Sequence, residues 1–303
     1  MTNRILAAGL CGWVLLAQAQ ALTPAQAQEM AAPPLAAVVN LEHVLEGKST
    51  ATVNVGGGVT LVLAVVDGRF GQSLTVLADG RQVQQLEGGR FIACARLEAG
   101  PITYWAISEF TGGAHCCGQF AFLARAAAGQ PVRYLGQTMG YNGGPRDFPG
   151  SFTYRHGQLY FESFDNRFDY FHTSHADSLL VNVPRSYYRL TPATLTVDTI
   201  PFKDGYMNEA AAVDQKIRQQ ATHQFGKADA ILRPGFSPGF ENLAFSDTLG
   251  QLLVKRTVLY LFAREDQLAW DTFRRDVSRY YLTSDWVPQL QQEVYKTLRA
   301  HPY

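Results

Sequence analysis

The sequence has few charged residues and no excess of either sign. Its 303 residues include 26 basic and 26 acidic side chains, and charged residues make up 17% of the chain, against roughly 25% in a typical soluble domain. A neutral chain lacks the basic surface that nucleic-acid binders need, so we expect no nucleic-acid partner. With 47% hydrophobic residues, the chain is also too apolar and too weakly charged to be disordered throughout.

Long hydrophobic runs are missing after the N-terminus. No later stretch approaches the roughly 20 apolar residues that cross a bilayer, so we expect no transmembrane span beyond the first residues. The N-terminus itself has Arg4, then an apolar stretch over residues 5–16, then small-x-small sites ending at Ala19, Ala21 and Ala27. This order is typical of a cleaved secretory signal. We predict a signal peptide over residues 1–21 and a periplasmic or secreted protein.

Cysteine is scarce, with 4 residues in the whole chain. Cys11 lies in the predicted signal peptide, which leaves Cys94, Cys116 and Cys117. An exported protein is expected to use cysteines in disulfides. Because three is an odd number, one thiol must remain free, bond another chain or bind a ligand.

The first two thirds of the chain have the pattern of a β meander. Residues 22–48 are rich in Ala, Gln and Pro at their start and predict a flexible leader. Short apolar runs rich in β-branched and aromatic residues then recur between Gly turns such as Asp67-Gly68, Asp79-Gly80 and Gly88-Gly89. Such spacing predicts a β-rich domain over residues 49–204, arranged as a sandwich, barrel or propeller-like stack.

The last third has the period of helices. Residues 205–303 contain apolar side chains three and four positions apart, for example Trp270, Phe273, Val277 and Tyr280. This spacing places them on one helix face. Short links between the helices predict antiparallel packing. The fold class is therefore α+β, with an antiparallel β meander followed by a helical hairpin or bundle.

The most specific string is TGGAHCC at residues 111–117. It resembles an [S/T]-G-G-A-H-C-C element of uncharacterised exported bacterial proteins, in which a stretch like residues 164–171 followed by Ser178 also recurs. The resemblance covers about the central third of the chain. It implies an exported protein and assigns no activity.

Three interpretations remain open for the cysteines of this string. Cys116 or Cys117 could form a disulfide with Cys94, which is the interpretation we favour because exported β-rich proteins use cysteine mainly in disulfides. The adjacent pair could instead form a strained and labile vicinal disulfide. Alternatively, His115, Cys116 and Cys117 could bind a metal ion.

A metal site would need further ligands, and His172 and His175 are the candidates. Two imidazoles three positions apart share one side in a helix or turn but point to opposite faces of a strand. If His172 or His175 folded against His115, Cys116 and Cys117, the mixed nitrogen and sulfur ligands would suit zinc or copper. The alternative is two loop histidines that bind no metal.

Two other features lie nearby. The segment at Asp165 and Arg167 lacks the pattern of a calcium loop and favours an Asx-type turn with an arginine pair. Aromatic residues are dense from 148 to 188, which indicates either core packing or a binding platform for a glycan or peptide. For the platform we single out Phe168, Tyr170 and Phe171.

The sequence contains none of the common catalytic signatures. We therefore expect an exported, non-enzymatic binding protein with no cofactor, whose partner is an envelope protein, peptide or glycan. The alternatives are a metal-binding or thiol-redox protein centred on His115, Cys116 and Cys117, and then a hydrolase whose site the sequence does not reveal.

Overall fold

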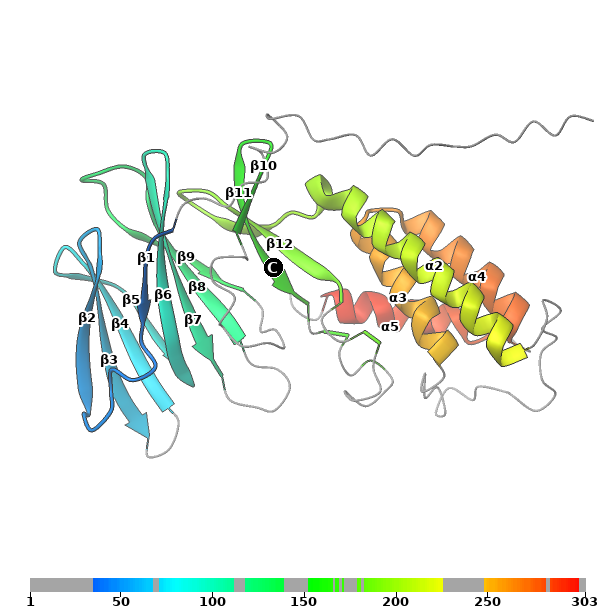
Figure 1. The fold of residues 1–303 in the computed structure, drawn as a ribbon, viewed down its shortest axis with the longest axis horizontal. Helices are drawn as coiled ribbons and strands as arrows, with labels where there is room; N and C mark the ends of the chain where they lie inside the picture. Colours follow the sequence, from blue (N-terminus) through cyan, green and yellow to red (C-terminus); the bar gives the residue numbers. More distant parts are fainter. Residues whose placement is uncertain are drawn as a thin grey trace, which may run out of the picture.

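A computed structural model of the chain shows antiparallel sheets followed by helices (Figure 1). It describes residues 35–67, 71–111, 118–138, 152–165, 167–168, 171, 179–180, 183–225, 248–281 and 284–299. These residues form three antiparallel sheets and a C-terminal helical layer, which confirms the predicted α+β class. The predicted signal peptide lies outside the described residues.

The first sheet is a simple meander. It consists, in spatial order, of β2 (Thr50–Gly56), β3 (Val59–Asp67), β4 (Gly71–Ala78) and β5 (Arg81–Gly88). Asp79 and Gly80 join β4 to β5 with φ angles of 50° and 77°. Two consecutive positive φ values define the tight hairpin turn for which Asp-Gly is preferred, so the turn predicted at these residues is confirmed.

The second sheet has an additional strand from the N-terminus. Its spatial order is β1 (Leu35–Asn40), β6 (Arg90–Ala99), β7 (Ile102–Phe110), β8 (Gly118–Arg125) and β9 (Arg133–Gln137). The prediction of a flexible leader over residues 22–48 is wrong from residue 35 onward. There the chain pairs with β6, with Val39 opposite Cys94, and Leu41 is buried. This pairing satisfies backbone groups that a free leader would leave to water.

The third sheet is again a four-stranded meander. It consists of β10 (Phe152–Arg155), β11 (Gln158–Phe164), β12 (Arg185–Leu190) and β13 (Leu195–Val197). A positive φ at His156 and Gly157, of 51° and 72°, closes the turn between β10 and β11. The three meanders follow one another in the chain and also in space (Figure 1).

The sheets stack face to face around two hydrophobic cores. Alternate residues of β7 point in opposite directions, so Trp105 and Ile107 enter the core shared with the first sheet, while Tyr104 and Ala106 enter the core shared with the third sheet. The middle sheet is therefore buried on both faces.

Helices cover the remaining face of the third sheet. After a short 3-10 turn, η3 (Ile200–Phe202), come α2 (Lys203–Phe225), α3 (Thr248–Phe262), α4 (Asp266–Tyr280) and α5 (Val287–Arg299). The predicted face of α4 is confirmed, because Trp270, Phe273, Val277 and Tyr280 are all buried. Among the described residues, no helix has the length and hydropathy to cross a membrane.

The third sheet and the helices share one core. Tyr160 of β11 packs in the same cluster as Phe202, Tyr206 and Leu253. The predicted division near residue 205 therefore marks a change of secondary structure, and apolar packing continues across it. Face-to-face burial of this kind is the main stabilising contribution in layered folds.

A buried ion pair also joins the sheet to the last helix. Asp165, directly after β11, accepts a hydrogen bond from the backbone N–H of Arg167 at 3.1 Å and forms an ion pair with its guanidinium. The same guanidinium donates to the carbonyl oxygen of Leu298 in α5 at 2.5 Å. The Asx-type turn with an arginine pair that the sequence predicted is thus confirmed.

A second buried arginine joins three helices through two ion pairs. Arg256 of α3 contacts Asp214 of α2 at 2.5 Å and Asp276 of α4 at 2.7 Å. Since a buried charge is costly unless it is paired, these two carboxylates account for a charged side chain at the centre of the helical layer.

Candidate functional site

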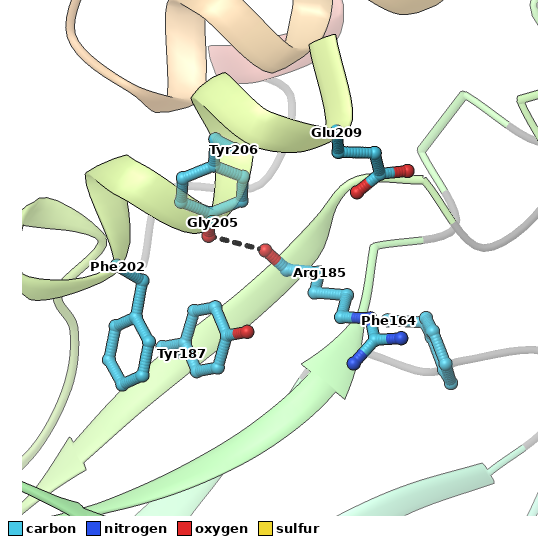
Figure 2. A pocket seen from close by; sticks show the side chains of 7 residues that line it. All are labelled: Phe164, Arg185, Tyr187, Phe202, Gly205, Tyr206 and Glu209. Atoms are coloured by element: carbon cyan, nitrogen blue, oxygen red, sulfur yellow. Dashed lines mark hydrogen bonds between the residues drawn. The ribbon is translucent and has the colours of Figure 1, made fainter. Parts of the chain in front are cut away.

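A pocket lies where the third sheet meets α2. Its volume is about 470 Å³, and it is lined by Phe164, Arg185, Tyr187, Phe202, Gly205, Tyr206 and Glu209 (Figure 2). The lining comes from β11, β12, η3 and α2. It combines aromatic rings with one cation and one carboxylate, a mixture that is common in sites for small polar ligands.

The local periodicity explains why these side chains meet. Arg185 and Tyr187 are two positions apart on β12, so both point to the same face of the sheet. Tyr206 and Glu209 are three positions apart on α2 and share one helix face. The packing of α2 on the third sheet brings the two faces together (Figures 1 and 2).

Stacked aromatic rings form the inner wall. The rings of Tyr187 and Phe202 lie parallel, with centroids 3.5 Å apart and an interplanar angle of 2°. Tyr206 meets Tyr187 edge-on at 6.1 Å, and Tyr160 meets Phe202 edge-on at 5.0 Å. Because each ring packs against another, this wall is preformed and does not depend on a ligand.

Arg185 is the cation of the pocket. Its side chain is 52% exposed, its Nη1 donates to Glu162 at 2.6 Å, and its guanidinium lies 5.6 Å from the ring centroid of Phe164. Burial is the largest single influence and opposes the charged form, but Glu162, Tyr187 and Glu209 together outweigh it, and the pKa of Arg185 is raised. A guanidinium has five N–H donors, so a half-exposed one can also donate to a ligand.

The backbone of Arg185 is fixed as firmly as its side chain. The Tyr206 hydroxyl donates a hydrogen bond of 2.6 Å to the carbonyl oxygen of Arg185, the dashed line in Figure 2. This bond joins α2 to β12 directly beneath the pocket. The guanidinium therefore projects from a backbone position set by two elements.

Tyr187 is a hydrogen-bond donor at neutral pH. Burial, and then the negative charge of Glu162, raise its pKa to about 12. The phenol consequently remains protonated in the physiological range and is a poor base or nucleophile.

Glu209 supplies the acidic group on the opposite side. It projects from α2 toward the pocket in Figure 2, and its carboxylate lies 4.0 Å from the ammonium of Lys255 on α3. Arg185 and Glu209 thus offer a donor and an acceptor from two different elements.

Two residues of the predicted binding platform are core residues. Phe168 is fully buried and Phe171 is 9% exposed, their rings meet edge-on at 5.4 Å, and both pack in the helical core. The prediction that they form an exposed binding face is wrong, because the helices cover this side of the sheet. Tyr170 lies outside the described residues.

The predicted metal ligands His115, Cys116, Cys117, His172 and His175 also lie outside the described residues. Within the described part of the chain, no group of three or more His, Cys, Asp or Glu side chains could hold a metal ion. The zinc or copper site stays a prediction.

Cys94 is the one predicted site cysteine that the structure describes. It is free and buried on β6, within the core between the first two sheets, and burial raises its pKa to about 12. Its predicted partners Cys116 and Cys117 are not among the described residues, so the pairing stays a prediction.

Sequence reasoning did not single out most of the pocket. Phe164 and Tyr187 belong to the aromatic-rich stretch that it noted, and that density was the available signal. Arg185, Phe202 and Glu209 carried none, because they reach the pocket only through the packing of α2 against β12.

Comparison of the chain with known protein families, curated proteins and solved structures gives no match.

Proposed function

We propose that this is an exported protein that binds a peptide or glycan without transforming it, and that the ligand occupies the pocket between β12 and α2. The observation that carries the proposal is the half-exposed Arg185 beside the preformed aromatic wall. A guanidinium next to packed rings is a common means of recognising carbonyl, carboxylate or hydroxyl oxygens attached to an apolar surface.

The lining supports binding rather than catalysis. Among the described residues, the lining has no Ser, Cys or His side chain, and Tyr187, one of its two tyrosines, keeps its proton because its pKa is about 12. Its guanidinium is already paired with Glu162. A pocket of this kind can orient a ligand by hydrogen bonds and ring contacts but offers no activated nucleophile.

Export is the second part of the proposal. It rests on Arg4, the apolar residues 5–16 and the small-residue sites that follow. Cleavage after Ala21 would leave β1 intact, since that strand begins at Leu35. The mature protein would therefore keep the whole second sheet. Mass spectrometry of the protein recovered from the medium or periplasm should find Leu22 as the N-terminal residue, and full-length protein retained in the cytoplasm would refute export.

The binding proposal can be tested on peptide and glycan arrays. Labelled mature protein should retain a small set of related peptides or glycans. Arg185→Ala should lose them, because it removes the guanidinium from the pocket. Mass spectrometry of a retained ligand after prolonged incubation should find it unchanged.

Arg189→Ala provides the matched control. Arg189 lies on the same face of β12, its side chain is 43% exposed, and it has its own carboxylate partner, Asp198, at 3.8 Å, but it does not line the pocket. This variant should bind like the wild type. Equal retention by wild type and Arg185→Ala, or steady conversion of a ligand to product, would overturn the proposal.

A further inference from the structure

A second pocket lies further along α2, between that helix and α3. Its volume is about 580 Å³, and Val213, Lys216, Leu252 and Lys255 are among its lining residues. Val213 and Lys216 are three positions apart on α2, and Leu252 and Lys255 are three positions apart on α3. Each helix therefore presents one apolar and one cationic side chain to the same space.

Lys255 is the unusual group in this pocket. Its side chain is only 19% exposed, and the ion pair that it forms is with Glu209 at 4.0 Å, a distance too long for a hydrogen bond. Burial lowers its pKa, Glu209 offsets part of this effect, and the charge of Lys216 adds to it. Among the described residues, the carboxylate that faces this ammonium is that of Glu209 at 4.0 Å, so its charge is poorly compensated there.

Apolar side chains complete the lining. Val213 and Leu252 are buried, whereas Leu179, which also lines the pocket, is exposed. An apolar chain placed against these residues would be removed from water, which favours binding. The lining thus combines the two ammonium groups of Lys216 and Lys255 with apolar side chains.

We propose that this second pocket binds a small apolar carboxylic acid, with its carboxylate between Lys216 and Lys255 and its carbon chain against Val213 and Leu252. The carboxylate of the ligand would lie close to the ammonium of Lys255 and balance its charge, whereas the carboxylate of Glu209 is 4.0 Å away. An amine would be repelled by both lysines, and a neutral chain would add no counter-charge to that of Glu209. This proposal does not rest on the function proposed for the first pocket, although Glu209 lines that pocket and also pairs with Lys255.

Three probes with the same alkyl chain length but different head groups distinguish the effect of charge on affinity from the effect of apolar contact. Octanoate, octanol and octylammonium are titrated into the mature protein by isothermal titration calorimetry, and inorganic phosphate is titrated as an anion without a chain. Octanoate should bind most tightly, by roughly tenfold or more over octanol, the size expected for one charge-assisted interaction. Octylammonium and phosphate should bind more weakly than octanoate.

Two lysine variants assign the binding to this pocket. Lys255→Met and Lys216→Met should each weaken octanoate binding while leaving octanol binding unchanged. Lys296→Met on α5, an exposed lysine outside the pocket, is the matched control and should bind octanoate like the wild type. Lys255→Met should unfold at the same temperature as the wild type or higher, because it removes a poorly paired buried charge.

The outcomes separate clearly. Octanol or phosphate binding as tightly as octanoate would overturn the proposal, as would octanoate affinities in Lys255→Met and Lys216→Met equal to that of the wild type. If Lys255→Met does not fold, Lys216→Met decides, because Lys216 is an exposed residue. The Arg185→Ala variant should bind octanoate normally, which keeps this test independent of the first pocket.

Discussion

The guanidinium of Arg167 holds the carbonyl oxygen of Leu298, a residue 131 positions later in the chain, at 2.5 Å. The same guanidinium is paired with Asp165, and both side chains are almost fully buried. One arginine therefore joins the end of β11 to α5. Through this contact the C-terminal helix is fixed to the sheet that carries the candidate binding pocket.

We expect Arg167→Met to destabilise the fold by about 3–5 kcal/mol, because it removes the guanidinium that is paired with the buried Asp165 carboxylate. Urea unfolding measures the loss. Arg185→Met is the control, since the pair that it breaks is exposed and should contribute no more than about 1 kcal/mol. A loss below about 1 kcal/mol in Arg167→Met would show that this buried pair does not hold α5 to the sheet.

Gly57 tests the packing of the first sheet on the second. It has a φ angle of +61°, and a Cβ atom added there would lie 2.7 Å from Cζ2 of the buried Trp105. Gly57→Ala should therefore cost about 1–2 kcal/mol for its backbone conformation and about 1–3 kcal/mol more for the clash.

Gly80→Ala separates these two contributions. Gly80 has a φ angle of +77°, but apart from its chain neighbours no atom of the described residues lies within 4 Å of an added Cβ, so only the backbone cost of about 1–2 kcal/mol should remain. Thermal unfolding of both variants provides the comparison. Equal losses would mean that Trp105 moves aside freely and that the core between the two sheets is loosely packed.

Cys94 should be unreactive in the native protein. Burial raises its pKa from the ordinary 9.0 to about 12, and the thiolate is the nucleophilic form. Iodoacetamide at pH 8 should leave Cys94 unmodified in the native state and modify it in urea, as peptide mass spectrometry would show. Modification at equal rates in both states would contradict the burial, whereas a peptide linking Cys94 to Cys116 or Cys117 would confirm the disulfide predicted from the sequence.

The same shift has a consequence for stability. The unfolded thiol releases its proton above about pH 9 and the buried one only near pH 12. Between these values the unfolded state binds fewer protons, so the contribution of Cys94 to stability is complete below pH 9 and is lost as the pH rises toward 12. Cys94→Ala should therefore show a smaller fall in stability over this range than the wild type in urea unfolding, and an identical fall would contradict the assignment.

Local signals in the sequence were sufficient for much of the fold. The Asp79-Gly80 turn follows from the backbone preferences of its own two residues, and the buried face of α4 follows from helical spacing. The Asx turn at Asp165 likewise depends on a neighbour two positions away. Each of these features is decided within a few residues.

Features that depend on contacts between residues far apart in the sequence could not be predicted from local patterns. β1 is a strand because β6 offers it a free edge, and the Ala- and Pro-rich composition around it suggested a leader instead. Phe168 is buried because helices much later in the chain cover it. Arg185 and Glu209 line one pocket only after α2 packs on β12, and neither belongs to a recognisable motif.

The most direct test of the proposed function is the affinity of the mature protein for a ligand identified on the arrays, measured by isothermal titration calorimetry in the wild type, Arg185→Ala and Arg189→Ala. Loss of the charge-assisted contact with Arg185 should weaken binding by roughly tenfold or more, while Arg189→Ala should match the wild type. Equal affinities in all three proteins would contradict a binding site at the pocket between β12 and α2.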